Sequence, residues 1–161
     1  MRRNGLFLGL VLIALVAGFG AAPAAAAGGR VDSGTWELGV LLGEPTGFSA
    51  KYWTTLSTAV DFGAAWSFEE NGNFHLHCDY LVHNYDIFKV DEGSLPLYFG
   101  IGGRVLFQDK DSRVGLRIVL GLEYLAAAYP MSVFFEVAPI VDFAPETEAS
   151  INGGLGIRYV F

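Results

Sequence analysis

Strict alternation of apolar and polar residues is the feature that most limits how this chain can fold. From Trp36 to Phe161, bulky apolar residues recur at every second position in eight separate runs. Two is the side-chain period of a β-strand, whereas an amphipathic helix repeats its apolar face about every 3.6 residues. The runs cover residues 36–42, 48–52, 60–68, 74–82, 97–107, 114–120, 133–141 and 151–161.

Turn-forming residues separate the eight runs. They gather in the segments 43–47, 55–58, 69–73, 84–94, 108–112, 121–130 and 144–147. Strands that follow one another through such segments pair antiparallel with their neighbours in the chain. The sequence therefore predicts an all-β fold, an eight-stranded antiparallel up-and-down β-barrel. Inside the sixth connection, Leu122 to Ala128 is aliphatic enough to predict one short helical turn at a membrane–water boundary.

The two faces of the predicted strands distinguish a membrane barrel from a soluble one. One face carries large aliphatic and aromatic side chains, and the other mixes Gly, Ala and Ser with charged residues and His. Glycines on a solvated outer face would only weaken the strands, but inside a narrow barrel they leave room for long charged neighbours. We therefore expect the polar face inside and the apolar face toward lipid, which makes the barrel transmembrane.

Aromatic residues near the ends of the runs favour the same orientation, because Trp and Tyr gather at membrane–water interfaces. The candidates are Trp36, Tyr52, Trp66, Tyr80, Tyr98 and Tyr159. Tyr98 has the parity of the polar face, so it fits this role least well.

The first 27 residues have the pattern of a cleaved secretory signal. Arg2 and Arg3 precede an apolar run that is too short to span a bilayer, and small residues follow it, with a cleavage site at Ala24-x-Ala26. We expect residues 1–27 to be removed and residues 28–161 to form the barrel. An uncleaved anchor helix is the alternative. Cys78 is the only cysteine of the chain, which excludes an internal disulfide.

Composition agrees with an exported membrane protein and excludes one class of partner. The chain is 52% hydrophobic and has a positive mean hydropathy of +0.40. Its formal net charge is −7, with a pI of about 4.8. A surface that binds nucleic acid needs clustered Lys and Arg, so we expect no nucleic-acid partner.

Charged residues on the inward parity form the candidate site. They carry both signs, and unpaired charges in a narrow interior are costly, so we expect them to pair across strands. The predicted interior charge set is Glu37, Lys51, Asp61, Asp79, Arg104, Arg117, Glu136, Asp142 and Arg158. Structural pairing is the main interpretation. A gated polar path or a small-solute pore is the functional alternative.

Three histidines, His75, His77 and His83, share the inward parity. His75, His77 and Asp79 follow one another at two-residue spacing, which puts three possible metal ligands on one face of a strand. Each lies about 7 Å from the next along the strand. Imidazole and carboxylate suit zinc or another divalent metal. Hydrogen-bonded histidines that bind no metal are the alternative, and we expect no resident cofactor.

The C-terminal pattern Ile157-x-Tyr159-x-Phe161 resembles the terminal strand signal that bacterial outer-membrane barrels present to their assembly machinery. With the signal sequence and the eight runs, the chain resembles the small outer-membrane barrels typified by the OmpA transmembrane domain and OmpX. Gly-rich segments such as 98–104 and 153–159 are similar to a family of uncharacterised small barrels of this kind. The resemblance implies an outer-membrane location, contact with outer-membrane lipids and delivery by the barrel assembly machinery.

One departure from those relatives concerns the loops. With both termini periplasmic, the outward connections are short, and the longer connections, 84–94 and 121–130, face the periplasm. Outer-membrane barrels usually have long outer loops and tight inner turns. Either the topology is inverted, or the barrel displays little at the cell surface.

The predicted function is that of a monomeric, non-enzymatic outer-membrane barrel with a structural, binding or minor pore role. One alternative is a soluble periplasmic barrel that binds an apolar ligand, as lipocalins do. A less favoured alternative is an enzyme that modifies lipid A, for which only Ser67 could pair with an inward histidine across strands. We therefore expect no catalytic residues.

Overall fold

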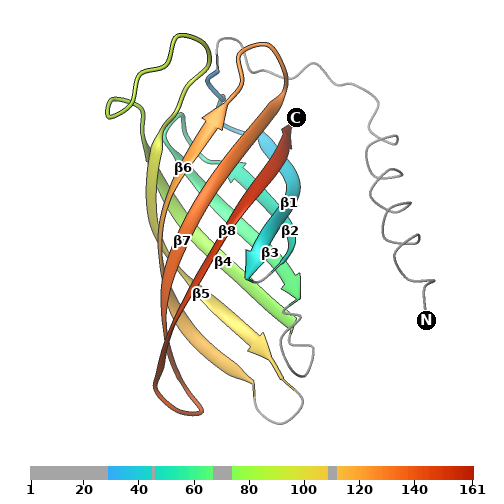
Figure 1. Cartoon of the computed structure of the whole chain (residues 1–161), viewed down its shortest axis with the longest axis vertical. Helices are drawn as coiled ribbons and strands as arrows, with labels where there is room; N and C mark the ends of the chain where they lie inside the picture. Colours follow the sequence, from blue (N-terminus) through green and yellow to red (C-terminus); the bar gives the residue numbers. More distant parts are fainter. Residues whose placement is uncertain (1–28, 45, 67–73, 109–111) are drawn as a thin grey trace, which may run out of the picture.

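The computed structural model describes residues 29–44, 46–66, 74–108 and 112–161. These residues form eight strands, each paired antiparallel with its neighbours in the chain, and β8 pairs with β1 to close a barrel (Figure 1). The strands are β1 (Trp36–Glu44), β2 (Thr46–Trp53), β3 (Thr58–Trp66), β4 (Phe74–Asn84), β5 (Leu97–Phe107), β6 (Arg113–Leu125), β7 (Met131–Ala144) and β8 (Glu148–Val160). The prediction of an all-β, eight-stranded up-and-down barrel is confirmed.

The two ends of the barrel differ in their connections. At the terminal end, where β1 begins and β8 finishes, lie the connections 54–57, 85–96 and 126–130. At the far end, short connections join β1 to β2 and β7 to β8. Figure 1 shows the chain end marked C at the same end as the long connection between β4 and β5. The longest described connection therefore lies at the terminal end, as the sequence predicts.

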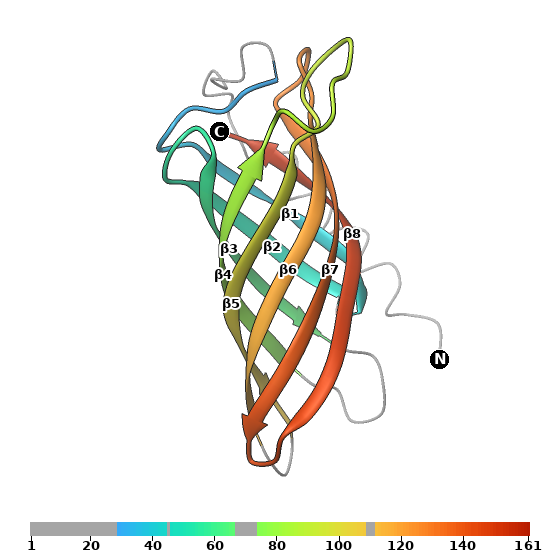
Figure 2. The same ribbon diagram turned by 90° about the vertical axis from the view of Figure 1, so that its left-hand side faces the viewer.

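The strands are strongly tilted relative to the barrel axis, which Figure 2 shows from the side. The tilt follows from the register of the strands. If each residue is followed to its partner on the next strand, once around the barrel, the path ends on β8 at a residue that is not the β8 partner of the starting residue. The path runs from Glu37 through Lys51, Asp61, Asp79, Gly102, Arg117 and Ile140 to Ser150. The β8 partner of Glu37 is instead Val160. Such a stagger is what closes a sheet into a barrel.

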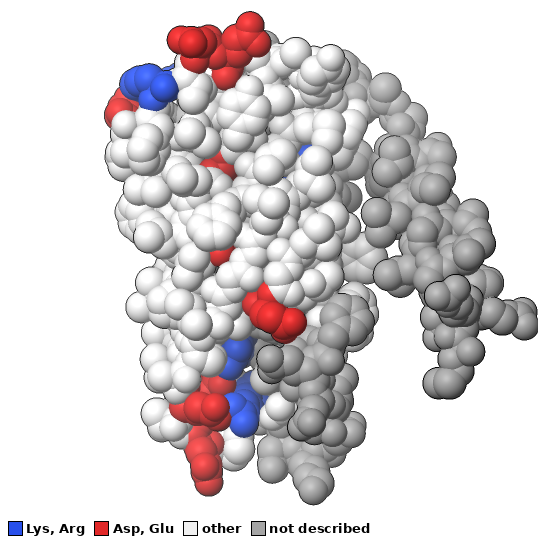
Figure 3. All heavy atoms as spheres, viewed as in Figure 1, with Lys and Arg blue, Asp and Glu red and all other residues white. Residues whose placement is uncertain are grey.

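The outer wall of the barrel is apolar. Large aliphatic and aromatic side chains alternate outward along every strand, among them Phe62 (40% exposed), Ile118 (56%) and Phe135 (52%). On the face in Figure 3, Lys, Arg, Asp and Glu gather mainly at the two ends of the molecule, and the wall between them is mostly without charge. Soluble barrels have the opposite arrangement, with bulky apolar residues inside and charges outside.

Exposed aromatic rings form a belt near the far end of this wall. Rings on four successive strands follow one another: Phe48 to Trp66 with centroids 6.2 Å apart, Trp66 to Phe74 at 5.2 Å, and Phe74 to Phe107 at 6.1 Å.

Near the terminal end a second group of rings includes the Trp36–Tyr52 pair (4.8 Å) and the Tyr159–Phe161 pair (4.9 Å). Tyr98 does not belong to either group. It is fully buried inside the barrel, so its placement among the interfacial rings was wrong, and its parity gave the correct side.

Strands β6 and β7 extend further into the connection between them than the sequence predicts. β6 continues to Leu125 and β7 already begins at Met131, so the predicted helical turn at Leu122–Ala128 is wrong: most of it is strand. The pairs Leu122–Phe135 and Tyr124–Val133 continue the ladder beyond the predicted turn, and backbone pairing outweighs the local aliphatic pattern. Among the described residues, no helix is long and apolar enough to cross a membrane. The predicted signal, residues 1–27, lies outside the described residues.

Two apolar layers fill part of the interior. One lies at the terminal end and consists of Val31, Trp53, Ala59, Leu125 and Val160, with Tyr85 packed against it. The other consists of Leu41, Leu81, Tyr98, Val119, Phe134 and Ala138. The first closes the terminal end with a Trp side chain that has no exposed surface.

Candidate functional site: the charged interior

All nine residues of the predicted interior charge set lie inside the barrel, and none has more than 6% of its surface exposed. His75, His77 and His83 are buried with them. Every strand contributes at least one of these twelve side chains, because the inward parity is kept around the whole barrel. Their side-chain contacts divide them into three groups along the barrel: a terminal group, a middle group and a far group.

The terminal group is centred on Glu123, a residue outside the predicted set. Its carboxylate accepts a hydrogen bond from Lys51 Nζ at 2.6 Å and another from Arg158 at 3.2 Å, and the His83 ring lies 3.5 Å away. The side chains of Lys51, His83 and Glu123 have no exposed surface. Two cations and an imidazole therefore share one fully buried carboxylate.

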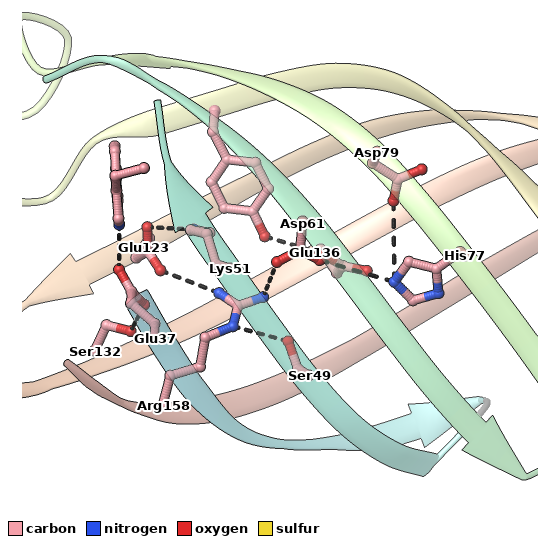
Figure 4. Close-up of polar contacts among 12 residues, drawn as sticks. Glu37, Ser49, Lys51, Asp61, His77, Asp79, Glu123, Ser132, Glu136 and Arg158 are labelled. Atoms are coloured by element: carbon pink, nitrogen blue, oxygen red, sulfur yellow. Dashed lines mark hydrogen bonds and ion pairs between the residues drawn. The ribbon is translucent and has the colours of Figure 1, made fainter. Parts of the chain in front are cut away.

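Arg158 links the terminal group to the middle of the barrel. Besides Glu123, its guanidinium donates to Ser49 Oγ at 2.8 Å and to Asp61 at 2.7 Å (Figure 4). Its charge lies 3.6 Å from the centre of the Phe134 ring. A planar guanidinium with five N–H donors can bind several acceptors and stack on a ring at the same time, which a compact ammonium group cannot do as well.

Glu37 is held differently. Trp53 Nε1 and Ser132 Oγ both donate to its carboxylate at 2.6 Å. Among the described residues, no Lys or Arg nitrogen lies within ion-pair distance of it. Glu37 is thus a buried carboxylate solvated by two neutral donors.

The middle group joins two acids through one guanidinium. Arg117 donates to Asp79 at 3.0 Å and to Glu136 at 3.1 Å, and Tyr98 donates to Glu136 at 3.2 Å. The side chain of Arg117 is 1% exposed. These bonds tie together four strands, β4 to β7, across the interior.

The far group is smaller and closer to solvent. Arg104 donates to Asp142 through two nitrogens, at 2.9 and 2.5 Å, and to Ser150 at 3.0 Å. Further out, Arg113 pairs with Glu148, whose side chains are 32% and 55% exposed. Burial of the ion pairs therefore decreases from the terminal end to the far end.

The structure rearranges the predicted metal ligands. Asp61, His77 and Asp79 bring one ligand atom each to within 4.8 Å of one another, while His75 is not part of this set. The His75 ring instead approaches Asn152 (3.4 Å). His77 and Asp79 come from one strand as predicted, but the third ligand candidate is supplied by the neighbouring strand β3.

Sequence reasoning missed Glu123, Trp53 and Ser132. Glu123 was assigned to a connection, although it continues the inward parity of Gly115, Arg117 and Gly121. That parity was the available signal. Ser132 was missed for the same reason, because β7 begins earlier than its apolar run.

Buried acids outnumber buried permanent bases among the described residues. The buried acids are Glu37, Asp61, Asp79, Glu123, Glu136 and Asp142, and the buried bases are Lys51, Arg104, Arg117 and Arg158. With all of them ionised, the interior carries two surplus negative charges, which histidine protonation, carboxyl protonation or a bound cation must offset.

Comparison with solved structures finds the same architecture elsewhere. The crystal structure of the N-terminal beta-barrel domain of Pseudomonas aeruginosa OprF matches with a TM-score of 0.61, over 79% of this chain and 96% of that domain, at 14% sequence identity. The two chains share a fold. The predicted resemblance to small bacterial barrels is thus confirmed at the level of the fold. No protein-family model and no curated protein sequence matches the chain.

The arrangement offers little for nucleophilic catalysis. Within the described part of the chain, the side chains with a polar atom within 4.0 Å of a histidine ring nitrogen are Lys51, Asp61, Asp79, Glu123 and Asn152, and no serine hydroxyl is among them. A nucleophile needs a base within hydrogen-bond reach. Ser67, the serine considered from the sequence, lies outside the described residues.

Proposed function

We propose that this chain is a monomeric outer-membrane β-barrel protein whose interior is closed, and that its role is structural or lipid-binding rather than catalytic. The observation that carries the proposal is the inverted polarity of the barrel. Its wall is apolar, its charges are buried inside, and exposed aromatic rings lie near both ends. Water would penalise such a wall, whereas a bilayer stabilises it.

The strand lengths also support insertion in a membrane. β4 to β8 have 11 to 14 residues, and β1 to β3 have 8 or 9. A tilted strand needs about 9 to 11 residues to cross the hydrocarbon core. Among the described residues, the three shorter strands lie next to one another in the barrel.

The contents of the interior support a closed state. An eight-stranded barrel is just wide enough for side chains to fill it. Here ion pairs and two apolar layers occupy the interior, including the fully buried Trp53 at the terminal end. A soluble barrel of the lipocalin type needs an apolar cavity for its ligand, and the charged interior does not supply one.

The C-terminal strand supports delivery by the barrel assembly machinery. Ile157 is exposed on the outer wall, and the rings of Tyr159 and Phe161 lie beside each other. The Phe161 amide donates to the Trp36 carbonyl at 2.8 Å, so the last residue still pairs with β1. These three residues are the proposed assembly signal.

The test of the proposed function is electrophoresis of purified protein in SDS with and without boiling, together with fractionation of the cells. A folded membrane barrel migrates differently from its boiled form and is recovered with outer membranes. Recovery in the soluble periplasmic fraction, with no heat-dependent shift, would contradict the proposal and favour a soluble barrel.

A minor pore is the second candidate function, and the polar far half of the interior favours it. His75, Arg104, Asp142 and Asn152 line that half with polar groups. Single-channel recordings in planar bilayers test the idea. The closed interior implies no conductance, in the wild type and in Arg104→Ala. Steady conductance that Arg104→Ala or Glu136→Ala alters would establish the pore instead.

A further inference from the structure

Three possible metal-ligand atoms face one another in the middle of the barrel, and the histidine nitrogen among them makes no hydrogen bond to either of the two carboxylate oxygens. His77 Nε2 lies 3.8 Å from Asp61 Oδ2 and 4.0 Å from Asp79 Oδ2 (Figure 4). Both separations are too long for a hydrogen bond. Two carboxylate oxygens and an imidazole nitrogen that face one point are, however, the ligand set of a divalent transition metal.

Two guanidinium groups fix the carboxylates beside His77. Arg117 Nε donates to both oxygens of Asp79, at 3.2 Å to Oδ1 and at 3.0 Å to Oδ2, so it shares the oxygen that faces His77. Asp61 accepts a hydrogen bond from Arg158 on its other oxygen, Oδ1, at 2.7 Å, which leaves Oδ2 directed at His77. Partners that hold a ligating carboxylate from behind are a regular part of metal sites.

Glycines on the neighbouring strands make the space for two of the ligands. Gly63 is the register partner of His77, and a Cβ at Gly63 would overlap the imidazole ring. Gly102 is the register partner of Asp79, and a Cβ there would overlap its carboxylate. The positions of both side chains thus depend on the absence of side chains opposite them.

The His77 ring supplies an independent sign that this group lacks a partner. Its other nitrogen, Nδ1, is buried without a hydrogen-bond partner, and the side chain is 3% exposed. Asp61 and Asp79 are 3% and 1% exposed. The nitrogen that faces the two carboxylates is Nε2, which lies 3.8 and 4.0 Å from them, so a metal ion between them would satisfy Nε2 but not Nδ1.

The charge of the surroundings also fits a dication. The interior carries two surplus carboxylates, and a divalent cation offsets both. Arg117 and Arg158 add positive charge next to the ligands, and each of them also contacts a further carboxylate, Glu136 for Arg117 and Glu123 for Arg158.

We propose that Asp61, His77 and Asp79 form a buried binding site for one divalent transition-metal ion, of the zinc class. A tetrahedral ion about 2.0 to 2.2 Å from each ligand needs ligand atoms about 3.3 to 3.6 Å apart. The separations of 3.8 and 4.0 Å between His77 and the two carboxylates are close to that range, and the two carboxylate oxygens, which lie within 4.8 Å of each other, approach by up to about 1.5 Å when the ion binds. The three residues leave a fourth position for water. Because the site is enclosed, the metal enters as the barrel folds.

The experiment measures zinc bound to the untagged protein. Full-length mature protein is refolded into detergent micelles from urea with zinc chloride, its folded state is verified by the heat-dependent gel shift, and free metal is removed by dialysis. Elemental analysis then gives the zinc content per chain. We expect one zinc ion per chain in the wild type, and none retained in His77→Gln.

The matched control is His75→Gln. This residue lies on the same strand and the same face, and it is outside the three-ligand set, so the variant should keep the full zinc content. Asp61→Asn should weaken zinc binding at least about tenfold. A wild type that folds and retains no zinc overturns the proposal, as does loss of zinc in His75→Gln with retention in His77→Gln.

If a variant does not fold, the extended X-ray absorption fine structure (EXAFS) at the zinc edge of the wild-type complex still tests the proposal, because it identifies the atoms that coordinate the metal. The site predicts one imidazole in the coordination sphere of the wild-type zinc complex, with oxygens filling the rest. Two imidazoles would place the metal on His75 and His77 and would overturn the assignment. Absence of zinc with an intact gel shift rejects the metal site and leaves the membrane barrel standing.

Discussion

The terminal half and the far half of the interior differ in how their charged side chains are paired and in how deeply they are buried. In the terminal half, Lys51 and Arg158 share the fully buried Glu123, and an apolar layer around Trp53 seals the end. In the far half, Arg104 and Asp142 form one isolated pair, and beyond it Arg113 and Glu148 are partly in solvent. The contrast indicates that the terminal half determines stability and closure, and that the far half tolerates change.

Glu123→Gln should give the largest effect. The amide keeps the size of the side chain but leaves Lys51 without its direct partner, and removal of one partner from a buried pair costs about 3 to 5 kcal/mol. The measurement is the free energy of unfolding in urea, in lipid vesicles, followed by Trp fluorescence. A loss below about 1 kcal/mol would show that the terminal half does not depend on this carboxylate.

Glu37→Gln is the matched control, and its effect should be much smaller. Glu37 is equally buried, but its partners are the neutral donors Trp53 and Ser132. The amide loses one acceptor, at about 1 kcal/mol, and removes one of the surplus negative charges, which offsets part of that loss. A destabilisation equal to that of Glu123→Gln would mean that burial alone, and not ion pairing, sets the cost.

Tyr98→Phe sharpens the comparison at the middle of the barrel. The change removes the hydroxyl that donates to Glu136 at 3.2 Å and keeps the ring in its apolar layer. Glu136 retains Arg117, so we expect a loss of about 1 kcal/mol in the same unfolding measurement. A loss as large as that of Glu123→Gln would extend the sensitive region beyond the terminal half.

Glu148→Gln should give the smallest effect. The Arg113–Glu148 pair is exposed at the far end, and exposed ion pairs contribute about 0 to 1 kcal/mol. We expect the free energy of unfolding to change by no more than about 0.5 kcal/mol. This difference between wild type and variant should become smaller still with added salt, since exposed charges are screened. A loss of several kcal/mol would contradict the assignment of stability to the terminal half.

Parity made the fold and the side of each charge predictable from the sequence. A period of two leaves only two faces, and small residues on one of them identify it as the inside. Each residue in the predicted interior charge set is buried in the structure. The same rule gave the correct side for Tyr98, where the expectation of an interfacial ring did not.

Register and strand length were not predictable in this way. His75 and His77 have the same two-residue spacing as His77 and Asp79, but only His77 and Asp79 bring ligand atoms together, and the His75 ring approaches Asn152 instead. Asp61 reaches His77 only because β3 and β4 pair in the observed register. Glu123 was lost because small and aliphatic residues after Gly121 looked like a connection, whereas pairing with β7 extends β6 through them.

The most direct test of the inverted barrel uses Cys78, the only cysteine, which lies exposed on the outer wall of β4. The protein is labelled there with an environment-sensitive fluorophore and inserted into vesicles, with Ala128→Cys in a Cys78→Ala background as a label in an exposed connection. Lipids that carry a quencher in the acyl chain should quench the Cys78 label, and aqueous iodide should quench only the Ala128→Cys label. Quenching of the Cys78 label by iodide, with no effect of the lipid quencher, would contradict the account.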